Sequence, residues 1–246
     1  ASNLSLYLTP YFLLERGKWS SSLSLPLKAQ RYFSQQRSFL FFNPSLYTRY
    51  QLDYHWKFSL YANLKRQQET LQHLAKLNGL FPTSTQQTYN LYGEYKNTVQ
   101  EFFVTASLTY NHSNRNTLLE QSVSEDAIVY TRREHPNHTD SWTLSSTLSK
   151  GVYDWHLKTS LTVLLSRNNG EQLTSLPGSD GTSQSLLQTY RYDYLKAEPK
   201  IIWSPTEVFE AEYHATVGYG GSKLGSDTHL TRDWILCHGY ASRSAS

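Results

Sequence analysis

The sequence predicts an all-β protein, an antiparallel up-and-down meander of about ten long strands that is a segment of a larger transmembrane β-barrel. Apolar and polar residues alternate with a period of two along most of the 246-residue chain. Tight turns and longer polar connections alternate strictly, which places all the tight turns at one end of the sheet. The alternating segments run to roughly 10 to 15 residues, whereas strands in soluble sheets average about 5 or 6 and a tilted membrane strand needs about 9 to 11.

Five strand pairs, each joined by a tight turn, account for the meander. In chain order they are 3–15 with 19–30, 41–52 with 55–66, 87–95 with 101–111, 140–150 with 153–166, and 186–203 with 208–220. The longer, more polar connections are 29–38, 66–86, 112–126, 167–184 and 220–228. Within the second of these, Leu71, Leu74 and Leu77 recur at helical spacing before Gly79, so we expect a short helix over 67–81.

Composition excludes several classes of protein. The mean hydropathy of −0.57 and the lack of an apolar run near 20 residues argue against a helical membrane protein. The net charge of +3 is too small to indicate a nucleic-acid partner. Charged residues make up 17% of the chain, and the polarity comes instead from hydroxyl and amide side chains and 19 tyrosines. Cys237 is the only cysteine, so no intrachain disulfide forms.

The two faces of the predicted strands differ in charge. Phe58, Leu60, Ala62 and Leu64 fall on one face of the segment 56–65, and the polar residues fall on the other. The same sorting holds over 157–165, 209–219 and 89–95, so charges concentrate on the face that we assign to a water-filled lumen. The predicted lumen residues, candidates for ligand binding, are Arg49, Lys57, Glu94, Lys158, Arg191, Glu210 and Glu212.

Aromatic residues gather near the tight turns. Tryptophan and tyrosine prefer the membrane interface, where one end of the ring is in an apolar medium and the other in water. We therefore expect a membrane-interface girdle at the turn end, and the alternative is that these rings cap a soluble core. The girdle residues are Trp19, Tyr54, Trp56, Tyr153, Trp155 and Trp203.

Two stretches resemble the barrels of TonB-dependent outer-membrane receptors, in particular the β-barrel family that is paired with a carboxypeptidase-regulatory-like front domain. The first, 43–67, has an Asn-Pro opening, a strand, a polar turn with an aromatic residue and a strand that ends in a charged loop; 88–118 continues the pattern. The likeness covers roughly 1–225. It implies a bacterial outer-membrane location, contact with outer-membrane lipid, uptake of a nutrient ligand and an inner-membrane energy-coupling partner. The class has about 22 strands around a plug.

The chain departs from that family in three ways. It holds about half the strands, it has no region that resembles a plug or a coupling motif, and its end, 232–246, lacks the alternating, aromatic-terminated last strand of such barrels. We therefore expect a barrel segment over 1–228, an atypical C-terminal tail over 229–246, and a chain that is a fragment. A glycan, a peptide and a metal chelate are all open as ligands.

No motif predicts an enzyme, a metal site or a cofactor. The Gly-x-Ser-x-Gly elbow is absent, and Ser179 lies in a turn-rich loop. His135, His138 and Asp140 are the types of residue that bind transition metals, but we interpret 134–140 as a solvated stretch. The Gly-rich segment 218–225 has no helix after it, which a phosphate loop requires. Two alternatives to the receptor barrel stay open: an outer-membrane barrel hydrolase and a soluble β-sandwich surface protein, in which Phe58 and Leu60 would face inward.

Overall fold

The computed structural model describes residues 3–32, 37–68, 83–124, 127–177, 183–206, 209–225 and 227–244. The strands are β1 (Asn3–Leu8), β2 (Tyr11–Arg16), β3 (Trp19–Ser24), β4 (Leu27–Tyr32), β5 (Arg37–Phe42), β6 (Ser45–Gln51), β7 (Trp56–Gln68), β8 (Thr83–Asn97), β9 (Phe102–Ser124), β10 (Ala127–Val152), β11 (Leu157–Pro177), β12 (Ser183–Thr206), β13 (Phe209–Leu224) and β14 (Asp227–Ser244). One turn of 3-10 helix, η3 (Tyr153–Trp155), joins β10 to β11. The prediction of an all-β antiparallel meander is confirmed.

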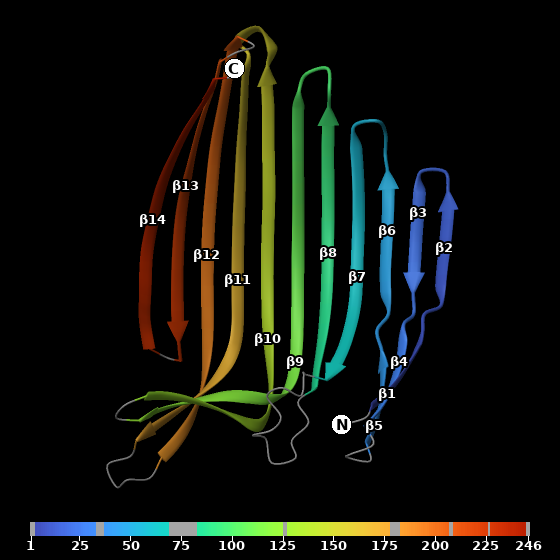
Figure 1. Cartoon of the computed structure of the whole chain (residues 1–246), viewed down its shortest axis with the longest axis vertical. Coiled ribbons are helices and arrows are strands. Elements are labelled where there is room, and N and C mark those ends of the chain that lie inside the picture. Colours follow the sequence, from blue (N-terminus) through green and yellow to red (C-terminus); the bar gives the residue numbers. More distant parts are fainter. Residues whose placement is uncertain are drawn as a thin grey trace.

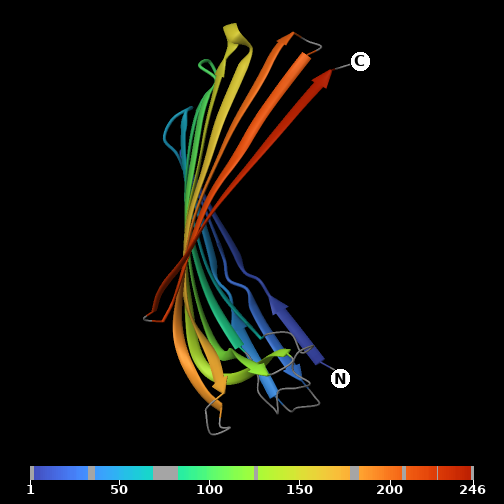
Figure 2. The ribbon, with the colours of Figure 1, turned by 90° about the vertical axis from the view of Figure 1, so that its left-hand side faces the viewer.

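Eleven strands form the main sheet, in the order β14-β13-β12-β11-β10-β9-β8-β7-β6-β3-β2. Each strand of β6 to β14 pairs antiparallel with its neighbour in sequence, so successive connections lie at opposite ends of the sheet (Figure 1). The turns before β7, β9, β11 and β13 lie at one end and the long hairpins at the other, where only residues 225–226 separate β13 from β14. The sheet is strongly twisted (Figure 2). It is also open, because within the described ranges its edge strands β2 and β14 do not pair with each other.

Prolines interrupt the first three long strands at the same level. Pro10, Pro26 and Pro44 separate β1 from β2, β4 from β3, and β5 from β6. A proline cannot donate a ladder hydrogen bond, but its carbonyl still accepts one: Leu25 donates to Pro10 and Asn43 to Pro26, each at 2.9 Å. The halves at the long-hairpin end, β1, β4 and β5, form a separate three-stranded sheet.

The strands extend well beyond the predicted lengths, and β10 reaches 26 residues. The predicted connections 112–126, 167–184 and 220–228 are wrong in this respect, because they consist mostly of strand. β9 takes up all but 125–126 of the first, β11 and β12 all but 178–182 of the second, and β13 and β14 all but 225–226 of the third. Their polar composition marks contact with water, while the backbones of each hairpin continue to pair with each other. In these hairpins the polar residues begin before the strands end, so polar composition did not mark the strand ends.

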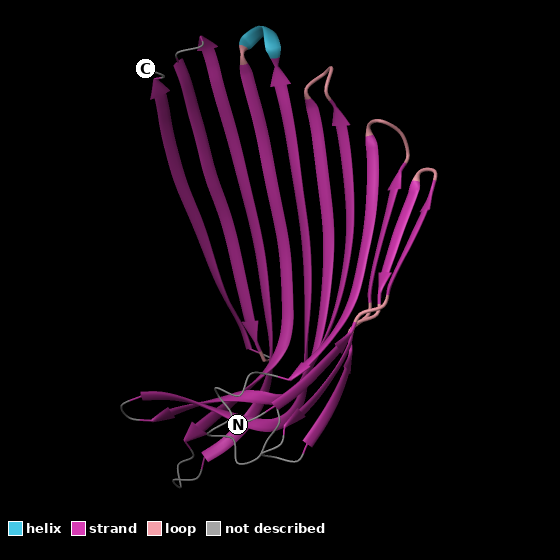
Figure 3. Cartoon of the chain, turned by 45° about the vertical axis from the view of Figure 1, so that its right-hand side comes forward, coloured by secondary structure: helices cyan, strands magenta, loops and turns pink. Residues whose placement is uncertain are grey.

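The β9–β10 hairpin bends away from the main sheet at its far end (Figure 3). The pairing of β10 with β9 shifts between Glu134 and Asn137, around Pro136. Beyond this point β9 pairs in parallel with β11, with Glu120 opposite Leu173. Residues 120–122 of β9 therefore pair with β10 along one edge and with β11 along the other.

The hydrophobic side chains lie mainly at the surface. Among the described residues, Phe41, Leu118 and Ala215 are the buried hydrophobic ones, and a much larger number of leucines and aromatic residues are exposed. A soluble sandwich would bury one face of its sheet in a core. The exposed hydrophobic side chains of this sheet have no such cover within the described residues.

One face of the main sheet carries a row of leucines in register. Each residue lies directly opposite the next, from β7 to β12, and all six are 36–54% exposed: Leu60, Leu91, Leu108, Leu144, Leu165 and Leu195. We call this face of the sheet the apolar face and the opposite one the polar face. Phe58 and Leu60 are exposed on the apolar face, which the sandwich alternative does not predict.

The predicted helix over 67–81 and the predicted C-terminal tail over 229–246 have different outcomes. The predicted helix over 67–81 falls almost wholly outside the described residues, apart from Gln67 and Gln68 at the end of β7. Most of the segment 229–246 belongs to β14, which pairs with β13 from Asp227 to Ser244. In the described ranges, no helix has the length and apolar character to cross a membrane.

Candidate functional site

The polar face of β7 to β12 is lined by hydroxyl, amide and charged side chains. One row across it consists of directly opposed residues: Lys57, Glu94, Thr105, Thr147, Thr162 and Glu198. In every strand the residues of the polar face alternate with those of the apolar face, because side chains in a strand point to opposite sides with a period of two. Such a face can hydrogen-bond to water or to a polar ligand.

Charges on the polar face are paired across or along the strands. Lys57 Nζ lies 3.3 Å from Glu94 Oε2, and the Tyr92 hydroxyl donates to the same carboxylate oxygen at 3.2 Å. Lys200 pairs with Glu212 at 2.8 Å and Lys196 with Glu198 at 2.7 Å. Each of these three carboxylates therefore has a cation beside it.

Amide and hydroxyl groups connect neighbouring strands on the same face. Asn90 Nδ2 donates to Ser107 Oγ at 2.9 Å and to Thr109 Oγ1 at 2.7 Å, and Thr88 Oγ1 donates to Asn111 at 2.8 Å. These side chains are half-buried. They make a hydrogen-bonding surface that can exchange protein partners for those of a polar solute.

Six of the seven predicted lumen residues lie on the polar face: Arg49, Lys57, Glu94, Lys158, Glu210 and Glu212. Their role as ligand contacts stays a prediction. Arg191 is an error: it has the same parity as Leu195 on β12, lies on the apolar side and pairs with Asp193 at 2.7 Å. Sequence reasoning missed Tyr92, Lys196 and Glu198, although the parity of Glu94 and Lys200 could have identified them.

The predicted interface aromatics cluster at the turn end. Trp19 contacts Tyr50, with ring centroids 4.6 Å apart, and Trp56 contacts Tyr95 at 4.8 Å. Trp203 packs edge-on against Phe209 at 6.1 Å. The remaining three, all strongly exposed, belong to the connecting turns: Tyr54, Tyr153 and Trp155. Their position in a membrane interface stays a prediction.

A second aromatic row, which the sequence analysis missed, runs parallel to the leucine row on the side of the long hairpins. Tyr89, Tyr110 and Trp142 lie directly opposite one another on β8, β9 and β10, with ring centroids 6.3 Å and 4.3 Å apart. Arg167 and Asp193 continue the row on β11 and β12. From Trp203 to Asp193 a strand covers roughly 33 Å, which a tilt of about 40° reduces to roughly 25 Å across a membrane. Aromatic residues therefore border the apolar residues at both ends.

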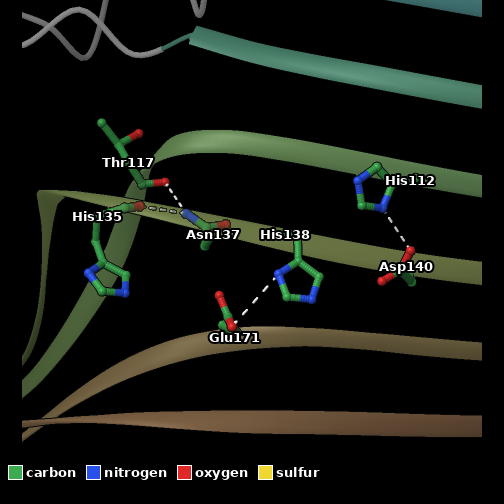
Figure 4. A network of polar contacts seen from close by, with 7 residues as sticks. All are labelled: His112, Thr117, His135, Asn137, His138, Asp140 and Glu171. Carbon is green, nitrogen blue, oxygen red and sulfur yellow. Dashed lines mark hydrogen bonds and ion pairs between the residues drawn. The ribbon is translucent and has the colours of Figure 1, made fainter.

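Beyond this second row the same face becomes polar (Figure 4). His112 Nδ1 lies 2.8 Å from Asp140 Oδ1, to which the Tyr110 hydroxyl also donates at 2.6 Å. Hydrogen bonds from Tyr110 and His112 hold the pKa of the Asp140 carboxyl below its ordinary value. His138 Nδ1 lies 3.8 Å from Glu171, which is the residue of β11 next to it.

This polar cluster does not form a metal centre as arranged. His135, which the sequence placed near His138 and Asp140, lies apart from them at the bend of β10, where its carbonyl accepts a hydrogen bond from Asn137 at 3.0 Å (Figure 4). Across the described ranges, no group of three or more histidine, cysteine, aspartate or glutamate residues could hold a metal ion. Ser179 lies outside the described residues.

No protein-family model matches the chain, and no curated protein sequence matches it. Solved structures do. The ferric-catecholate import receptor Fiu from Escherichia coli K12 matches in its closed form with a TM-score of 0.62 and 9% identity, over 99% of this chain and 46% of that receptor. Its open form matches with a TM-score of 0.60 and 8% identity, over 98% and 49%. The outer-membrane transporter YddB from Escherichia coli matches with a TM-score of 0.51 and 8% identity, over 95% and 36%.

These matches show that the chain has the fold of an outer-membrane barrel wall. The chain spans about half the length of the Fiu chains, consistent with an open sheet. The three similar structures are described as transporters or import receptors, and none as an enzyme. The predicted fold class, a segment of a larger barrel, is therefore confirmed, and the receptor role is taken up as a proposal.

Proposed function

We propose that this chain forms part of the wall of a bacterial outer-membrane barrel similar to TonB-dependent receptors, with its apolar face in lipid and its polar face on the lumen. The observation that carries the proposal is the in-register leucine row, exposed on six neighbouring strands and bordered by aromatic residues at both ends. Exposed apolar surface of this extent is costly in water and favourable in lipid.

The lumen-facing side would bind and pass a polar nutrient ligand. Paired charges such as Lys57 with Glu94, and amides such as Asn90, offer donors and acceptors without a strong net field. Binding without covalent chemistry suffices for this role. In the full-length transporter, an inner-membrane energy-coupling partner would drive passage of the ligand, as the resemblance to TonB-dependent receptors implies.

The likeness to Fiu and YddB supports the transporter class. In this proposal the long hairpins β9–β10 and β11–β12 lie on the outer side of the membrane, where ligand arrives, and the short turns lie on the periplasmic side.

Spin-label accessibility along β7 tests the proposal. Cys237 is first replaced by serine, and single cysteines are then introduced at positions 57 to 62 of the chain refolded into phosphatidylcholine vesicles. We expect collisions with oxygen to be highest at 58, 60 and 62, and collisions with a water-soluble nickel chelate to be highest at 57, 59 and 61. Protection of 58 and 60 from both reagents, in a chain that stays soluble without lipid, would instead support a soluble sheet.

A further inference from the structure

A groove of about 620 Å³ runs along the apolar face over β9 to β13. Its apolar lining consists of four leucines of the leucine row, Trp142 of the second aromatic row and Tyr219, which lies opposite Leu195 on β13: Leu108, Trp142, Leu144, Leu165, Leu195 and Tyr219. At the hairpin end it reaches Arg167 and Asp193. The groove is therefore apolar along its length and charged at one end, like the two parts of a membrane lipid.

The charged end is built around one carboxylate that holds two guanidinium groups. Arg167 Nε lies 2.6 Å from Asp193 Oδ1, and Arg191 Nε lies 2.7 Å from Asp193 Oδ2. Because each arginine uses Nε for this contact, its two terminal amino groups can still donate to another acceptor. Lys223 lies directly opposite Arg191 on β13. Three cations against one anion leave the cluster positive.

The position of the charged cluster along the strands fits a lipid headgroup. Arg167 and Asp193 lie in the same cross-strand row as Trp142, at the border between the leucines and the polar hairpins. A phosphate at this level could accept hydrogen bonds from both guanidinium groups while an acyl chain of the same molecule lies against Leu165 and Leu195. Arginine is the residue best suited to such a forked contact with phosphate.

We propose that this groove binds a membrane lipid whose headgroup carries a phosphate monoester, with the phosphate at Arg167 and Arg191 and an acyl chain along the leucines. The proposal rests on the membrane location put forward above. Asp193 acts as a positioning residue, since it holds both guanidinium groups on the apolar side. Lys223 adds positive charge beside them.

The test uses the full chain refolded into nanodiscs of nine parts phosphatidylcholine to one part phosphatidic acid. Native mass spectrometry after release compares the lipids retained with the bulk ratio. We expect about tenfold enrichment of phosphatidic acid on the unaltered chain. The double variant R167Q/R191Q should retain lipid at the bulk ratio, and the matched control R49Q, on the polar face, should keep the full enrichment.

Several results would overturn the proposal while leaving the proposed function intact: a chain that inserts without enrichment, equal enrichment on R167Q/R191Q, loss of enrichment on R49Q, or a second copy of the chain retained in place of lipid. Inorganic phosphate that binds the detergent-solubilised chain as tightly as phosphatidic acid would also overturn it, because an ion alone would then be the ligand.

Failure of the unaltered chain to insert into phosphatidylcholine would overturn the proposed function itself. If R167Q/R191Q does not fold, R167K/R191K decides: reduced enrichment supports the forked contact, and full enrichment contradicts it.

Discussion

Leu144 on β10 lies directly opposite Leu165 on β11, and both side chains are about 40% exposed, at 41% and 43%. Their neighbours Ser145 and Leu164 also face each other, on the polar face. A single residue step along either strand thus changes the surroundings completely. The leucine pair belongs to the surface that we assign to lipid, two residues from the border row at Trp142 and Arg167.

Arginine at Leu144 should therefore impair folding into a bilayer. A cation on the lipid face of a barrel costs about 2–4 kcal/mol at the membrane midplane and about 0–1 kcal/mol near the interface, and Leu144 lies between the two, so we expect a cost of about 1–2 kcal/mol. We expect Leu144→Arg to lower the urea concentration at the midpoint of folding into phosphatidylcholine vesicles. Tryptophan fluorescence measures this midpoint. Ser145→Arg is the matched control and should have a much smaller effect, because its side chain lies on the polar face. Equal losses in the two variants would contradict the assignment of faces.

Glu120 should hold the crossing of the β9–β10 hairpin in place. It is 2% exposed, pairs with Arg133 and accepts a hydrogen bond from Ser185 on β12. Glutamine keeps one acceptor oxygen, but it replaces the other with an NH2 donor and removes the charge that pairs with Arg133, at a local cost of about 1–3 kcal/mol. We expect Glu120→Gln to speed hydrogen exchange in 117–120 without changing exchange in 104–108. The exposed neighbour Glu134 provides the control, Glu134→Gln, which should leave both segments unchanged.

The Asp140 cluster should make the hairpin end sensitive to acid. The folded-state pKa of Asp140 lies below the ordinary 3.8, because Tyr110 and His112 stabilise the carboxylate. Its stabilising effect is therefore present above the ordinary pKa and is lost as the pH falls through the lowered value. Trp142 contacts Tyr110 and reports on this region through its fluorescence.

Asp140→Asn should remove that acid-dependent component of stability. At neutral pH we expect the variant to lose about 1 kcal/mol, and the difference from the unaltered chain should shrink on acidification. Asp154→Asn, in the turn η3, is the control and should follow the unaltered chain. A difference that stays constant with pH would contradict a role for the Asp140 carboxylate.

Gly170 makes room for an aromatic ring on the polar face. A Cβ atom at this position would lie 2.6–2.8 Å from the ring and hydroxyl of Tyr190, which is directly opposite on β12. We expect Gly170→Ala to lower the free energy of unfolding by about 1 kcal/mol, because Tyr190 must rotate away. Adding Tyr190→Ser should remove most of the effect in a double-mutant cycle. At Gly220 the nearest atom to an added Cβ is 3.4 Å away, so Gly220→Ala should be milder.

Local pattern was sufficient to predict the strands, their antiparallel order and the two faces. Lys57 and Leu60 lie on opposite faces because side-chain direction in a strand depends only on the parity of the position, which is visible in the sequence. The tight turn at Gly17, with φ +56°, and the turn at 52–55, where Asp53 accepts from the backbone of His55 and Trp56, are likewise local. The error at Arg191 came from taking charge as a guide to the lumen, when its parity with Leu195 points to the other face.

Cross-strand register and the bending of the hairpins were decided only in the tertiary structure. Three features join residues from separate strands, so no spacing along the chain predicts them. They are the leucine row, the stacked row of Tyr89, Tyr110 and Trp142, and the Arg167–Asp193–Arg191 cluster. The burial of Glu120 depends on the bend of the β9–β10 hairpin, because there β9 pairs with β11 while it stays paired with β10. The sequence by itself determined which side of each strand is apolar, because that follows from the residues of one strand. Only the folded sheet decided which residues meet, because register is set by pairing between strands.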